Sequence, residues 1–120
     1  MTSPRIAATT LYAKRGGKPR IKCIVTISAP RKVPGGSHMC RVQFSGIAKT
    51  REIHGEGAMQ ALMLAATYVQ LTLRVLLDRG WVLYYGPRDR KPFDFVKCWF
   101  PLQTMRGWRS SSTPERTRRR

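Results

Sequence analysis

The sequence predicts an α+β fold: an antiparallel sheet of about four strands, then one long helix packed on one sheet face, then an aromatic hairpin or extended segment. Three observations lead to this prediction. Apolar and polar residues alternate with the period of a β-strand in the first half of the chain. A long stretch with helical periodicity follows. Beyond it, eight of the eleven aromatic residues lie between Trp81 and Trp108. Strands followed by a helix are typical of an α+β domain.

The first two strands are expected at residues 5–14 and 20–28. Residues 5–14 are rich in residue types that favour strands, although the direction in which they face is not set by their pattern. The segment between the two, RGGKP, is a turn because of its glycine pair and proline. In residues 20–28, Cys23 and Val25 share an apolar face while Arg20 and Lys22 share the other.

Two more strands are expected after a loop at residues 29–37, which holds two prolines and two glycines. In residues 38–45, the side chains of Cys40, Val42 and Phe44 point one way and that of Arg41 points the other. A tight reversal then leads to an exposed strand at residues 47–54. With the helix on the Cys40 side, we expect Arg20, Lys22 and Arg41 to project together from the opposite face into water.

Residues 55–79 predict the long helix, and Gly80 is suited to end it. Its apolar arc is wide enough to need cover from more than one direction. A membrane span is rejected, because polar residues interrupt every run of about 18 residues. The polar residues form one helical stripe: Glu56, Gln60, Thr67, Gln70, Arg74 and Asp78.

The chain length of 120 residues fits one domain. We expect this domain to occupy residues 1–106. From Pro101 onward the composition shifts to Arg, Ser and Thr, so residues 107–120 are expected to be a basic, disordered tail. Residues 81–85 and 93–100 would cover the second apolar side of the helix.

The net charge of +17 is unevenly distributed, because residues 1–51 contain eleven Lys or Arg and no Asp or Glu. Such a field attracts polyanions. We therefore expect a non-enzymatic protein that contacts nucleic-acid backbone in a sequence-tolerant way. The residues expected to make these contacts are Arg20, Lys22, Arg41, Lys49, Arg51, Arg88, Arg90 and Lys91.

Two alternatives remain open. The protein is a protein-interaction module if the 55–79 helix pairs with a second copy of the chain, or if the basic residues meet an acidic protein. It is a small metal-independent ribonuclease if cations, tyrosines and a histidine gather around a phosphate. The residues of that site would be His54, Tyr84, Tyr85, Arg88 and Arg90.

Metal and cofactor sites are not expected. His38 and Cys40 are two residues apart, but the remaining cysteines, Cys23 and Cys98, are distant, whereas structural zinc sites use short paired spacings. Three cysteines without a CxxC pair, and a first segment lacking the apolar run of a signal peptide, favour a reducing cytoplasm. No catalytic motif is present, so no catalytic residue is proposed.

One sequence pattern carries a resemblance to a known family. Cys40, Val42, Phe44 and Gly46 stand at alternate positions, and they are followed on the helix by Gln60, Ala61, Leu62, Leu64 and Ala65. This combination, within about residues 5–86, resembles a family of small bacterial proteins known as a domain of unknown function. The resemblance implies a sheet-plus-helix fold and supplies no activity.

Overall fold

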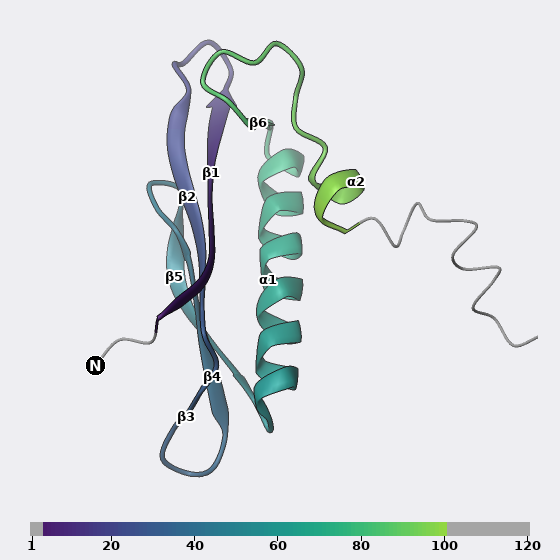
Figure 1. Ribbon diagram of the computed structural model, residues 1–120. Coiled ribbons are helices and arrows are strands. Elements are labelled where there is room, and N and C mark those ends of the chain that lie inside the picture. The colour runs from purple at the N-terminus through teal and green to yellow at the C-terminus, as the bar shows by residue number, and fades with distance from the viewer. Residues whose placement is uncertain (1–3, 101–120) are drawn as a thin grey trace, which may run out of the picture.

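The computed structural model describes residues 4–100, which form a sheet with both helices on one of its faces (Figure 1). The predicted α+β class is confirmed, with more strands than the four expected. The predicted boundary at residue 106 and the tail at 107–120 lie outside the described residues. In chain order, the elements are β1 (Arg5–Arg15), β2 (Ile21–Ser28), β3 (Arg31–Lys32), β4 (His38–Phe44), β5 (Ala48–Gly55), α1 (Ala58–Asp78), β6 (Trp81–Tyr84) and α2 (Phe95–Trp99).

All strand pairs are antiparallel, and the order across the sheet is β3–β4–β2–β1–β6, with β5 also paired to β4. Val42 of β4 has Ile27 of β2 on one side and Arg51 of β5 on the other, so β5 and β6 form the two outer edges. The chain thus leaves the sheet at one edge, crosses it as α1, and returns at the other edge.

The core lies between the sheet and α1. The predicted apolar faces of β2 and β4 are confirmed, because Cys40, Val42 and Phe44 are fully buried and Cys23 and Val25 nearly so. Burial raises the pKa of the Cys23 thiol to about 11 and also raises the pKa of Cys40, so both act as small apolar residues. On α1, the buried side chains recur every three or four residues: Ala61, Ala65, Val69, Leu73 and Leu76.

Glycines set both ends of α1. Gly55 ends β5 so close to the helix that a Cβ on it would lie 2.6 Å from the backbone nitrogen of Ala61. Gly57 is the N-cap and has extended backbone angles, and Gly80 follows the helix with φ of +92°. A left-handed glycine is a common way to end a helix. These two turns direct α1 across the sheet and back to it.

The segment after α1 was expected to be a hairpin or an extended segment, and it does not form a hairpin. Residues 81–84 add to the sheet edge beside β1, because the free backbone groups of β1 offer them a ladder partner. The chain then forms α2, where the Asp94 carboxylate accepts a hydrogen bond from the Lys97 N–H (3.1 Å). Phe95 of α2 is buried in the core. The aromatic segment therefore covers apolar surface as expected, but as a strand and a short helix.

Candidate functional site

The sheet face opposite α1, here called the open face, carries the side chains that alternate with the core residues. Neither α1 nor α2 lies on it (Figure 1). On β1, Leu11 and Ala13 are buried in the core, so Tyr12 and Lys14 belong to the open face. On β2, Lys22 is in register with Tyr12 and is exposed.

The expected grouping of Arg20, Lys22 and Arg41 is wrong, although all three side chains start from the open face. Arg41 lies beside Ser28, because its backbone N–H donates to the Ser28 hydroxyl (2.7 Å). Lys22 and Ser28 are six residues apart along β2, which corresponds to roughly 20 Å. Alternation along a strand predicts which face a side chain is on. The pairing register between β2 and β4, which alternation does not predict, places Arg41 at the opposite end of the open face from Arg20 and Lys22.

Arg41 is also partly neutralised. Its guanidinium forms an ion pair with the Glu52 carboxylate (3.1 Å), which is directly opposite on β5. Both side chains are partly exposed, at 36% and 51%. An ion pair this open to solvent contributes about 0–1 kcal/mol to stability. Its main effect is to reduce the free positive charge at this end of the open face.

Arg20 has a structural role that the sequence did not indicate. Its guanidinium lies 3.6 Å from the centre of the Tyr84 ring. It also donates hydrogen bonds to the backbone carbonyls of Gly86 (3.0 Å) and Asp89 (2.5 Å). Arg20 thereby holds the loop after β6 against the start of β2, and Figure 1 shows this loop beside the β1–β2 turn.

This contact assembles a group of cations, here called the basic end, from three chain segments. One is the β1–β2 turn with the adjoining strand ends, and the others are the start of β2 and the loop after β6. The nearby Asp89 is turned towards its own loop, because its carboxylate lies close to Gly86. The basic end consists of Lys14, Lys18, Arg20, Lys22, Arg88, Arg90 and Lys91.

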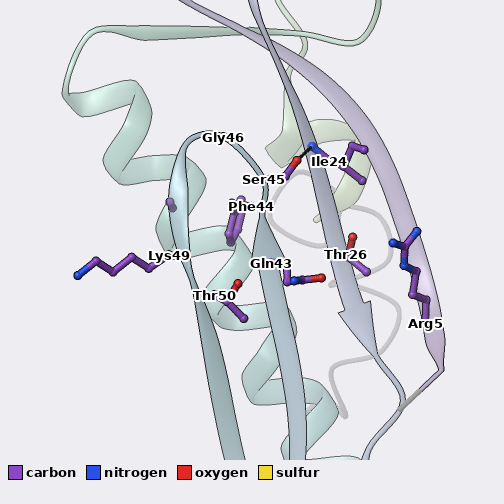
Figure 2. Close-up of a pocket in the computed structure, with 10 residues that line it drawn as sticks. Arg5, Ile24, Thr26, Gln43, Phe44, Ser45, Gly46, Lys49 and Thr50 are labelled. Carbon is purple, nitrogen blue, oxygen red and sulfur yellow. Dashed lines mark hydrogen bonds between the residues drawn. The ribbon is translucent and has the colours of Figure 1, made fainter. Parts of the chain in front are cut away.

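The remaining predicted contact residues lie apart from the basic end. Arg51 is on the helix side of the edge strand β5, with its guanidinium 5.5 Å from the centre of the Tyr68 ring. Lys49, also on β5, points away from the sheet (Figure 2). Of the eight predicted residues, the structure therefore brings together Arg20 and Lys22 with the three cations of the loop, Arg88, Arg90 and Lys91.

Two tyrosines lie on the open face, and the sequence did not place either of them there. Tyr12 and Tyr84 are direct partners across β1 and β6, and both alternate with buried residues. The facing of β1 was not set by its pattern, and β6 was not expected to join the sheet. Because Leu11 and Ala13 are buried and side chains alternate along a strand, Tyr12 between them faces outward.

Next to the basic end, the open face is hollowed by a shallow depression of about 510 Å³. Thr26 of β2, Gln43 of β4 and Thr50 of β5 line it, as Figure 2 shows. The Ser45 hydroxyl on its border accepts a hydrogen bond from the Ile24 N–H (2.9 Å). Arg5 of β1 lies at the far side. This polar surface, lined also by Lys49, offers hydrogen-bonding groups beside the basic end and has no acidic residue in its lining.

The residues of the alternative ribonuclease site are not gathered. His54 pairs with Met39, whereas Tyr84 is aligned through Tyr12 with Lys22. Along the strand direction, the register places His54 roughly 25 Å from Tyr84. Within residues 4–100, no three His, Cys, Asp or Glu side chains lie close enough to hold a metal ion.

The far side of α1 keeps a large apolar surface. Its exposed apolar side chains include Met59, at 70%, and Leu71, at 56%. By length and composition alone, α1 could cross a membrane, a test that core helices of soluble proteins also pass. In this structure its other side packs on the sheet. The exposed large residues of α1 are Met59, Met63, Leu64, Leu71, Val75 and Leu77.

Comparisons with protein-family models, with curated proteins and with solved structures find no match to this chain.

Proposed function

We propose that this protein binds nucleic acid without catalysis, through its basic end and the adjoining open face, and with little dependence on base sequence. The observation that supports the proposal is the assembly of the basic end by Arg20 from segments more than 60 residues apart. Backbone phosphates are the groups that clustered Lys and Arg side chains bind most readily. The polar depression beside the basic end supplies further hydrogen-bonding groups for sugar and phosphate oxygens.

Arg20 acts in this proposal as a positioning residue. Its guanidinium already contacts the Tyr84 ring and donates to two carbonyls, so it is not free to donate a pair of hydrogen bonds to a phosphate. The exposed side chains of Lys18, Lys22 and the loop cations are the expected phosphate contacts. Arg41 is expected to contribute less than the sequence suggested, because Glu52 is its partner.

The test is the salt dependence of binding to fluorescent single strands and a fluorescent duplex. The logarithm of the affinity should fall linearly with the logarithm of salt, by about 0.7–0.9 per neutralised phosphate. Lys18→Gln combined with Lys22→Gln should lower that slope by about 1–2. Arg31→Gln combined with Lys32→Gln removes the same charge from β3, at the other end of the sheet, and should change the slope much less.

Two results would contradict the proposal. One is the absence of binding to any of these nucleic acids at about 50 mM salt, where electrostatic binding is strong. The other is an equal change of slope in the two double variants, because bulk charge and not the basic end would then govern attraction. An acidic protein partner, the alternative use of the same cations, remains to be tested if nucleic acid does not bind.

A second candidate function is self-association through α1, favoured by its exposed apolar residues. Leu64, Leu71 and Val75 are exposed at the spacing i, i+7 and i+11, which places them on one stripe of the helix, as in the seam of a two-helix coiled coil. Two chains of charge +17 repel each other most at low salt. Self-association should therefore strengthen with salt while nucleic-acid binding weakens, and light scattering across a salt series distinguishes them. Leu71→Lys should abolish a dimer of this kind.

A further inference from the structure

We infer that the bound nucleic acid is single-stranded and that one of its bases stacks on Tyr12. This inference rests on the proposed function and adds the class of nucleic acid that the site takes. Tyr12 occupies the middle strand of a row of three in-register residues, Lys22 on β2, Tyr12 on β1 and Tyr84 on β6. It is half-buried, so part of the side chain reaches solvent from the open face.

Tyr12 differs from the other tyrosines of this region in having no ring partner. Arg20 covers the Tyr84 ring at 3.6 Å. The ring of Tyr85 packs against Phe93, with centroids 5.1 Å apart. Among residues 4–100, Tyr12 takes part in no aromatic or cation–π contact. Because Tyr12 is only partly buried and its ring has no such partner, its solvent-facing part can stack on another planar group.

Cations adjoin Tyr12 in two directions. Lys22 is its cross-strand neighbour, and such pairs have Cβ atoms about 4.5–5.5 Å apart. Lys14 lies two residues further along β1 on the same face, at about 7 Å. A nucleotide whose base lies on Tyr12 would therefore have two cations within reach of its phosphates, one across the strand and one along it. An aromatic ring beside cations is the arrangement with which proteins bind single strands of any sequence.

A duplex cannot use this ring, because its bases are paired and stacked on each other. Among residues 4–100, the open face also offers no helix to enter a groove, since α1 and α2 both lie on the other side (Figure 1). A duplex could gain only the backbone contacts. Stacking of one base on an aromatic side chain is worth about 1–3 kcal/mol, so a single strand should bind roughly 5–150-fold more tightly than a duplex.

The experiment compares full-length variants for binding to a single-stranded oligonucleotide and to its duplex. Tyr12→Ile keeps a strand-forming residue without the ring, and it should weaken single-strand binding by about 5–150-fold. Because no charge is removed, the salt slope should stay as in the wild type. Tyr12→Phe should bind as the wild type does. The comparison variant is Tyr85→Ile: Tyr85 is also exposed, at 56%, but it lies beyond the end of β6 and its ring packs on Phe93, so its loss should weaken single-strand binding much less than the loss of Tyr12. An equal or larger loss in Tyr85→Ile would move the stacking base from Tyr12 to Tyr85.

The outcomes separate the inference from the proposed function. If neither nucleic acid binds, the proposed function fails, and this inference fails with it. If both bind and the duplex binds as tightly as the single strand, the proposed function stands and the inference is overturned. An unchanged affinity of a folded Tyr12→Ile variant would overturn it as well.

A measurement on the wild type covers the case in which Tyr12→Ile does not fold. A 5-bromouridine oligonucleotide should photo-crosslink to the tryptic peptide of residues 6–14, which contains Tyr12. Crosslinks found only in peptides that include Tyr84 or Tyr85 would overturn the assignment to Tyr12.

Discussion

The two faces of the sheet differ in what they contact: one packs against α1 and the other faces solvent. Consecutive residues of β4 show this difference. Val42 and Phe44 are completely buried under α1, whereas Gln43 between them is exposed on the open face. The covered face consists of apolar side chains that close against a helix. The open face carries lysines, threonines and two tyrosines. Stability should therefore depend on one set of side chains and binding on the other, although the same strands supply both.

The largest test of this division is a pair of neighbouring substitutions, Phe44→Ala and Gln43→Ala. Phe44 is fully buried and its ring meets Tyr68 edge-on, with centroids 6.2 Å apart. Its truncation should lower the free energy of unfolding by about 3–5 kcal/mol, because it removes buried area and leaves a cavity. Gln43→Ala should change it by less than about 0.5 kcal/mol. Chemical denaturation measures both, and a similar loss in the two variants would show that the open face is also part of the core.

The next test concerns the junction that directs α1 onto the covered face. In Gly55→Ala, the new Cβ would meet the backbone of Ala61 at 2.6 Å, and backbone cannot move aside as a flexible side chain can. We expect a loss of about 1–3 kcal/mol. Gly57→Ser is the control two residues on, where a Cβ meets nothing within 4 Å. A serine N-cap there should add roughly 0.3 kcal/mol. Thermal melts that rank the two variants in the reverse order would contradict the close approach.

Sequence reasoning recovered the covered face far better than the candidate site. Alternation in β2 and β4 selects Cys23, Val25 and Phe44 as core, because each strand reports its own two faces. Helical periodicity and a glycine identify α1 in the same local way. These patterns need no knowledge of which strands are neighbours.

The site depends on pairings that no local pattern carries. Arg20 binds carbonyls 66 and 69 residues away, and β6 returns to the far edge of the sheet beside β1. The loop cations join Lys22 only through these contacts. Likewise, the Arg41–Glu52 pair follows from the β4–β5 register. Charge counting identified the kind of partner to expect, but not the place where the cations gather.

The smallest expected effect concerns the ion pair on the open face, and it separates charge from stability. Glu52→Gln removes the partner of Arg41, and the exposed pair contributes only about 0–1 kcal/mol, so the melting temperature should change little. The freed guanidinium should extend the cationic surface from the basic end along the open face. If a bound strand reaches that far, the salt slope should rise by up to about 0.7–0.9, the contribution of one phosphate.

Asp78→Asn changes the net charge equally at the end of α1, on the covered side, and should leave the slope as it is. A slope that is the same in wild type and Glu52→Gln would confine the contact to the basic end, and an equal rise in both variants would mean that total charge, not the open face, attracts the strand.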